Sequence, residues 1–164
     1  MRAALALAAL LALARAHALE PGSPVSAVSV PPLGGSAAAI ELPALRGKVV
    51  YVDFWASWCV PCRLSMPRLD ALHRRHAARG FTVIGVNKDA ALADAERFLK
   101  RVPVGFLLAR DADDALAKAF AVKAMPSGYL IDRRGVVRHV HRGFTAETAA
   151  SLEREIERLL AEPA

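Results

Sequence analysis

Two kinds of apolar pattern alternate along the chain from residue 37 onward. Short continuous runs rich in Val, Ile and aromatic residues predict buried strands, because a strand covered on both faces is apolar on both. Longer stretches whose apolar residues recur every three or four positions predict helices. Strands are expected at 37–42, 49–55, 81–86, 106–108, 128–131 and 136–141. Helices are expected at 59–79, 90–102, 113–120 and 146–160.

The order of these elements predicts the fold class. Strands that alternate with helices form an α/β fold, and a turn at 132–135 closes the last two strands into a hairpin. Gly80 is placed to end the first helix, Pro103 to stop the second, and Thr145 to cap the last. The sequence therefore predicts a mixed central sheet flanked by helices.

The N-terminal segment is expected to be a targeting signal. Arg2 precedes an uninterrupted Ala/Leu run, and Ala16 and Ala18 are small residues at the two positions that a signal peptidase recognises. The apolar run is shorter than the roughly 20 residues of a membrane span, which disfavours the alternative of a retained anchor. We expect cleavage near Ala18 and export to a bacterial periplasm.

We expect the chain to consist of three parts. Residues 1–18 form the expected secretory signal peptide, and residues 19–36, rich in Pro, Gly and Ser, predict a linker. Residues 37–164 are then long enough for a single domain.

Composition excludes several classes of protein. Apolar residues make up 54% of the 164, which excludes a disordered chain, and 2 Cys are too few for a disulfide-stapled miniprotein or a four-Cys zinc module. The net charge of +6 is scattered, so no nucleic-acid partner is indicated. His139 and His141 alternate on an expected strand and share one face, which we interpret as solvated, since two ligands are too few for a metal site.

The chemistry is expected at Cys59 and Cys62, which lie between an expected strand and the start of a helix. Free backbone N–H groups and the helix dipole at such a start favour a thiolate at Cys59, which is the nucleophile in thiol–disulfide exchange. Pro61 suits a first helical turn, where its missing N–H costs little. Asp53 is anomalous because every other residue of 49–55 is apolar.

Other roles for the two thiols fit the pattern less well. A structural disulfide across a four-residue loop would contribute little entropic stabilisation, and the setting at a helix start disfavours two inert core cysteines. A zinc site with His73 and His76 would need ligands that converge, yet the helix spacing places His73 about 16 Å beyond Cys62. Copper(I) accepts thiolates, which leaves a copper-handling or oxidase-assembly protein as an alternative, although no Met- or His-rich ligand set accompanies the pair.

The segment 52–62, VDFWASWCVPC, closely resembles the active-site segment of thioredoxins. From about residue 37 the chain resembles the exported thioredoxin-like reductases of the TlpA/ResA-like family. The segment 125–132, MPSGYLID, is similar to the family's segment around a cis-proline, and 90–108 matches the extra helix and strand of these exported relatives. The resemblance implies a thioredoxin-like fold with a helix–strand insertion.

The resemblance also implies roles for individual residues. Those implied in catalysis are Cys59 as the attacking thiol, Cys62 as the resolving thiol, Asp53 as a buried acid that assists proton transfer, and Pro126 as the cis-proline beside the disulfide. Those implied in substrate binding are Trp58, Pro61 and Met125. The Met125 backbone would pair with an extended substrate, and Trp58 would pack beside the site unless it is a plain core aromatic.

The implied function is that of a periplasmic thiol–disulfide oxidoreductase. It would act as a monomer without a cofactor, reduce disulfides of exported proteins, apocytochrome c among them, and be re-reduced by a membrane thiol electron donor. A disulfide-donating oxidase is the nearest alternative. Two departures from the family pattern stand out: residues 124–127 are AMPS where cytochrome-dedicated relatives often have Gly-x-Pro-Glu, and Gly85 stands where many thioredoxins have Lys near the buried acid.

Overall fold

A five-stranded mixed sheet forms the centre of the computed structural model, which describes residues 19–25, 28–34 and 38–163. The strand order is β5-β4-β3-β6-β7. Strands β3, β4 and β5 run parallel to one another, β6 runs antiparallel to β3, and β7 runs antiparallel to β6. The strands are β3 (Val49–Trp55), β4 (Phe81–Asn87), β5 (Leu107–Arg110), β6 (Ser127–Ile131) and β7 (Val137–Arg142). The helices are α1 (Cys62–His76), α2 (Leu92–Arg101), α3 (Ala115–Ala119) and α4 (Ala146–Ala161). These elements confirm the predicted fold class and the extra helix and strand, α2 and β5.

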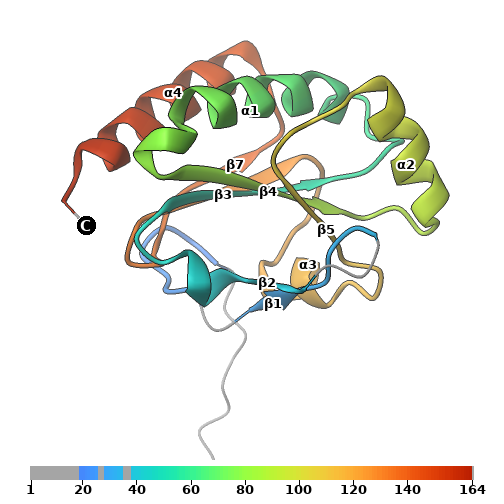
Figure 1. Cartoon of the computed structure of the whole chain (residues 1–164), viewed down its shortest axis with the longest axis horizontal. Coiled ribbons are helices and arrows are strands. Elements are labelled where there is room, and N and C mark those ends of the chain that lie inside the picture. The colour runs from blue at the N-terminus through green and yellow to red at the C-terminus, as the bar shows by residue number, and fades with distance from the viewer. Residues whose placement is uncertain (1–18, 26–27, 35–37, 164) are drawn as a thin grey trace, which may run out of the picture.

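The two faces of the sheet carry separate cores. Alternate residues of β3 face opposite sides: Tyr51 and Trp55 pack with α1, α2 and α4, whereas Val52 and Phe54 pack with α3 and the N-terminal segment. Figure 1 shows α1 and α4 side by side on one face of the sheet, and α3 with β1 and β2 on the other. The central strand is thus covered on both faces, and all seven of its residues are buried.

The start of α1 differs from the sequence prediction. The helix begins at Cys62 rather than Cys59, because the preceding residues form a turn in which Cys62 N–H donates to the Cys59 carbonyl at 3.2 Å. Pro61 is accordingly the N-cap of α1 and not its first helical residue. At the other predicted cap, the Thr145 side chain accepts from Thr148 N–H, as expected for the start of α4.

The expected linker at 19–36 is attached to the domain over its described residues. The two-residue strands β1 (Ser29–Val30) and β2 (Ile40–Glu41) pair with each other, while Pro24 bridges to Val136 and Pro32 to Ala109. Its apolar residues supply the reason, because they lose their contact with water on packing against the domain. Val25 and Val30 fill the α3 side of the core, and Leu33 packs on the opposite side.

The expected signal peptide at 1–18 lies outside the described residues. Among the helices of the described part of the chain, none combines the length and the apolar character that crossing a bilayer requires.

A buried carboxylate holds the loop that follows β3. Asp89 accepts hydrogen bonds from Ser57 N–H at 3.0 Å and from the Ser57 hydroxyl at 2.8 Å, and the Asn87 side-chain amide donates to it at 2.8 Å. Lys88 N–H donates to the Trp55 carbonyl at 2.9 Å. The sequence predictions do not include this network. Its signal is nevertheless present, since Asn87 and Asp89 lie at the carboxyl end of a strand parallel to β3.

Replacing this carboxylate should destabilise the loop. Asp89→Ala leaves the Ser57 N–H and the buried Asn87 amide without their partner, and each unsatisfied group costs about 1–3 kcal/mol. Chemical denaturation should therefore show a free energy of unfolding lower by about 2–3 kcal/mol. Asp94→Ala is the control, since Asp94 is a more exposed acid whose ion pair is with Arg97, and its effect should stay within about 0.5 kcal/mol. Equal effects for the two variants would contradict the anchoring role of Asp89.

Candidate active site

Cys59 and Cys62 form a disulfide at the junction between β3 and α1, with an S–S distance of 2.02 Å and a Cα–Cα distance of 5.3 Å. Cys62 is fully buried and Cys59 is 4% exposed, so Cys59 is the one of the two with any access to solvent. This exposure agrees with the expected roles, in which Cys59 attacks and Cys62 resolves.

An apolar rim of exposed side chains lies at the residues that adjoin Cys59 and Cys62 in the chain. Trp58 is 64% exposed, and Val60 and Leu64 are each 66% exposed, which makes these three the most exposed large apolar side chains in the described residues. Trp58 is therefore not a core aromatic, and the alternative role that we kept open for it is wrong. Exposed apolar side chains beside a reactive group are typical of a binding surface.

The Met125–Pro126 peptide bond is cis, as the sequence resemblance predicts. Ser127 lies opposite Phe54 in the pairing of β6 with β3, so Pro126 lies at the end of the sheet where β3 leads into the Cys59 loop. The neighbouring polar groups are engaged: the Pro126 carbonyl accepts from Gly143 N–H at 2.8 Å, and the Ala124 carbonyl accepts from the Ser127 hydroxyl at 2.7 Å.

Asp53 is buried inside β3, where only 1% of it is exposed. Burial raises the pKa of Asp53 well above its usual range, because desolvation disfavours the carboxylate. Its Oδ2 atom has no hydrogen-bond partner among the described residues. The expected burial of this acid is confirmed, and a buried carboxyl with a raised pKa binds a proton more tightly than an exposed one.

Asp53 lies between two glycines. Its cross-strand partners are Gly85 on β4 and Gly128 on β6, so the position at which many thioredoxins have Lys is directly beside the acid. A Cβ at Gly128 would lie 1.8 Å from the Tyr51 hydroxyl, and a Cβ at Gly85 would lie 3.1 Å from Trp55 Nε1. The space at Gly128 is therefore filled by the Tyr51 hydroxyl, whereas the space at Gly85 is shared by Trp55 Nε1 with the apolar side chains of Phe106 and Leu108.

The two histidines of the zinc alternative, His73 and His76, contact other side chains. His73 packs edge-on against Phe106, and His76 packs against Phe81 while its Nε2 lies 3.7 Å from Glu157. Within the described residues, no group of three or more His, Cys, Asp or Glu side chains is placed to hold a metal ion.

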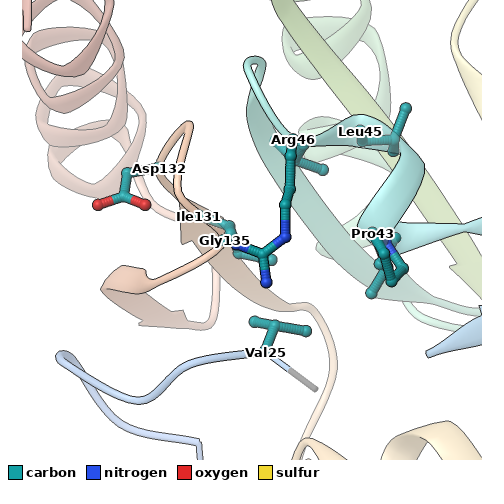
Figure 2. Close-up of a pocket in the computed structure, with 9 residues that line it drawn as sticks. Val25, Pro43, Leu45, Arg46, Ile131, Asp132 and Gly135 are labelled. Atoms are coloured by element: carbon teal, nitrogen blue, oxygen red, sulfur yellow. The ribbon is translucent and has the colours of Figure 1, made fainter. Parts of the chain in front are cut away.

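A small cavity lies at the opposite end of the sheet from the disulfide (Figure 2). Its lining includes Val25, Val50, Ile131 and Gly135, and Figure 2 shows the Arg46 side chain reaching toward Gly135. With a volume of about 20 Å³ it has room for a single water molecule and for no organic ligand. This cavity is therefore not a site for an organic ligand.

Known proteins resemble this chain in sequence. The family model Redoxin matches residues 20–157. Thiol-disulfide oxidoreductase ResA of Geobacillus kaustophilus is 31% identical over 112 residues, which are 68% of this chain and 63% of that protein. The protein of the same name from Bacillus cereus is 29% identical over 120 residues, 73% of this chain and 68% of that protein. The chain thus spans about two thirds of the length of these curated relatives.

Solved structures resemble the chain in fold. A candidate thiol:disulfide interchange protein DsbE from Chlorobium tepidum superposes with a TM-score of 0.82 and 38% identity, over 88% of this chain and all of that chain. A candidate protein disulfide isomerase from Bacteroides thetaiotaomicron gives a TM-score of 0.77 and 31% identity, over 88% and 92% of the two chains. Since the Redoxin model covers most of the chain and these neighbours share its fold, the protein belongs to the redoxin family, among the thioredoxin-like thiol–disulfide oxidoreductases.

Proposed function

We propose that the protein reduces disulfides of exported proteins in the bacterial periplasm by thiol–disulfide exchange at Cys59 and Cys62. The observation that carries this proposal is the position of the disulfide, beneath an exposed apolar rim and on the same side of the sheet as a buried acid. The rim suits exposed apolar segments of a polypeptide, and the acid suits the proton transfer that exchange requires.

The first half of the reaction begins with the reduced protein. The Cys59 thiolate attacks one sulfur of a substrate disulfide, the substrate S–S bond breaks, and its other sulfur leaves with the electron pair. The product is a mixed disulfide between Cys59 and the substrate. The Met125 backbone, between the engaged carbonyls of Ala124 and Pro126, is the position at which an extended substrate pairs beside this bond. Trp58 and Pro61 contact the substrate from the other side.

The second half releases the substrate. Cys62 gives its proton to Asp53 and attacks the Cys59 sulfur, so that the Cys59–Cys62 disulfide forms and the substrate sulfur leaves as a thiolate. The protein is oxidised by two electrons and the substrate is reduced by two. A membrane thiol donor then returns two electrons to the pair.

The start of α1 supports the reducing direction. A strong oxidant needs a highly stabilised thiolate, supplied by free N–H donors or a nearby cation. Here Cys62 N–H donates to the Cys59 carbonyl at 3.2 Å, and Arg63 N–H donates to the Val60 carbonyl at 3.1 Å. The residues from Trp58 to Cys62 carry no charge. Two of the N–H groups at this helix start are thus engaged by carbonyls, which reduces the number left to stabilise the Cys59 thiolate and supports the proposed reducing direction.

The cellular setting rests on the sequence. An N-terminal signal at 1–18 supports export, and the mature N-terminus should then be Leu19, which mass spectrometry of the exported protein can measure. Exported proteins with disulfides are the substrate class, and apocytochrome c is one member of it to test.

The reduction potential of the Cys59–Cys62 pair tests the proposed direction. Equilibration of the protein in glutathione or dithiothreitol buffers, followed by thiol alkylation, measures it. A value near that of thioredoxin, about −270 mV, is expected of a reductase. A value near that of a strong oxidant, about −120 mV, would instead assign the protein to disulfide donation.

The two cysteines should differ when each is replaced. Cys62→Ser removes the resolving thiol, so Cys59 should accumulate mixed disulfides with substrates, and mass spectrometry should identify them on Cys59. Cys59→Ser should abolish reduction and trap nothing, because the remaining thiol is fully buried. Substrates trapped on Cys62 in the Cys59→Ser variant would reverse the assigned roles.

Asp53→Asn should slow resolution and stabilise the fold at neutral pH. The unfolded chain releases this proton near pH 4, whereas the raised pKa of Asp53 makes the folded protein release it only at higher pH. The free energy of unfolding of the wild type therefore falls as pH rises from about 4 toward that raised pKa, and the variant escapes this fall. Resolution of the mixed disulfide near pH 7 should slow at least about tenfold, since positioned bases contribute 10² or more.

The matched control is Asp70→Asn. Asp70 is also buried, but it accepts from Gly105 N–H at 2.8 Å and pairs with Arg74 at 2.8 Å, so its replacement should destabilise the fold. Resolution in this variant should keep the wild-type rate. Asp53 has no part in the reaction if the Asp53→Asn variant resolves mixed disulfides at the wild-type rate between pH 6 and 8.

A further inference from the structure

Three residues of three strands form one row across the face of the sheet that α1 and α4 cover. Asp53 of β3 pairs with Gly128 of β6, and Gly128 pairs with His141 of β7. Directly paired residues in antiparallel strands point to the same face, with Cβ atoms about 4.5–5.5 Å apart. The row therefore has Asp53 at one end and His141 at the other. Gly128 lies between them and has no side chain.

The hydroxyl of Tyr51 occupies the gap. It lies 1.8 Å from the position that a Cβ of Gly128 would take, so it stands between Asp53 and His141. The rings of Tyr51 and His141 have centroids 6.1 Å apart. Asp53 Oδ2 and His141 Nδ1 are both buried and have no hydrogen-bond partner among the described residues, and the same holds for Glu155 Oε2. A proton-carrying hydroxyl thus lies between two buried polar groups with unused capacity.

From His141, a series of polar side chains continues through Glu155 to His139 at the surface. His141 Nε2 lies 3.1 Å from a carboxylate oxygen of Glu155 on α4, and the other Glu155 oxygen lies 3.2 Å from Nδ1 of His139. Exposure rises along this series, from 1% for Asp53 and Tyr51 to 11%, 15% and 32% for the side chains of His141, Glu155 and His139. The solvated strand face that we expected for the two histidines is wrong, because α4 packs over it.

Few other charged groups face this cluster. Arg158 of α4 lies 3.0 Å from His139 Nε2, and Arg138 of β7 acts on His139 from its own strand. The Ser151 hydroxyl of α4 donates to Glu155 at 2.8 Å. Nearer the buried end, the charges that act on Tyr51 are those of Asp53 and Glu155. The arginines thus adjoin the exposed end of the series and not its buried end.

We infer that Tyr51, His141 and Glu155 form a proton path that connects Asp53 to solvent at the surface between β7 and α4. After Asp53 has taken the proton of Cys62, it passes that proton to the Tyr51 oxygen while the Tyr51 hydroxyl gives its own to His141. His141 then passes a proton to Glu155, which releases it to water, and the departing substrate thiolate takes up a proton from solvent. The path rests on the proposed role of Asp53 and makes Tyr51, His141 and Glu155 positioning residues of the same reaction.

The geometry of the site explains why a second exit is useful. Cys62 is fully buried, and a substrate seated on the apolar rim covers the little of Cys59 that faces solvent. A proton on Asp53 is then enclosed on that side until the substrate leaves. The protonation states suit transfer along the path from Asp53 toward Glu155. Burial raises the pKa of Tyr51, which keeps its hydroxyl protonated. Burial lowers the pKa of His141, which leaves this side chain neutral and able to accept a proton.

The pH profile of mixed-disulfide resolution tests the path. The variants are Tyr51→Phe and His141→Gln, which keep the size of each side chain, with Glu155→Gln as a third should either fail to fold. Each should slow resolution about tenfold or more near pH 7, a loss within the range that positioned proton transfer contributes. The loss should disappear at high pH, where the Cys62 thiol ionises without a base. A merely structural role would slow the reaction equally at every pH.

Two further variants make the outcome decisive. Tyr129→Phe is the matched control, because Tyr129 is an equally buried tyrosine that donates to the Phe120 carbonyl on the other face of the sheet, and its pH profile should be that of the wild type. Asp53→Asn is the reference. If Asp53→Asn slows resolution while the Tyr51 and His141 variants keep the wild-type profile, the path is refuted and the role of Asp53 stands. If Asp53→Asn has no effect, the proposed role of the acid fails and the path fails with it.

Discussion

Strand β3 is paired on both edges and covered on both faces, and each part of the site depends on that burial. Its carboxyl end delivers the chain into the Cys59 turn. The neighbouring ends meet there: β4 leads into Asp89, which holds the loop, and β6 begins directly after Pro126. Because backbone pairing fixes these three ends relative to one another, the disulfide, the cis-proline and the loop anchor share one rigid edge of the sheet.

The same burial lowers the stability that Asp53 allows the fold and raises its affinity for a proton. A desolvated acid weakens the fold wherever it must ionise, yet that desolvation raises its proton affinity, on which the proposed proton exchange with a thiol depends. The glycines at 85 and 128 relieve crowding beside it and let the polar ends of Tyr51 and Trp55 approach. Asp53 thus lowers the stability of the fold at the one position where the proposed reaction needs a buried acid. The apolar residues around it keep the strand intact.

The electrostatics at the start of α1 complement this arrangement. A turn whose carbonyls engage the first helical N–H groups leaves Cys59 with the helix dipole but few direct donors. A modestly stabilised thiolate is a good nucleophile and a poor leaving group, which is what the proposed reducing direction requires. The uncharged rim of Trp58, Val60 and Leu64 is exposed beside this turn, where the proposed substrate would bind.

The sequence by itself determined the α/β fold, the strand that carries Asp53, and the redox pair at Cys59, because these follow from local periodicity and from the spacing of two thiols. Only the tertiary structure decided where α1 begins, since the turn competes with the helix for the same N–H groups. It also decided the surroundings of His139 and His141: alternation gave their shared face, but whether water or α4 covers that face depends on packing between elements far apart in the chain. The contact of Tyr51 with Gly128 is likewise a matter of register between strands, which local sequence does not specify.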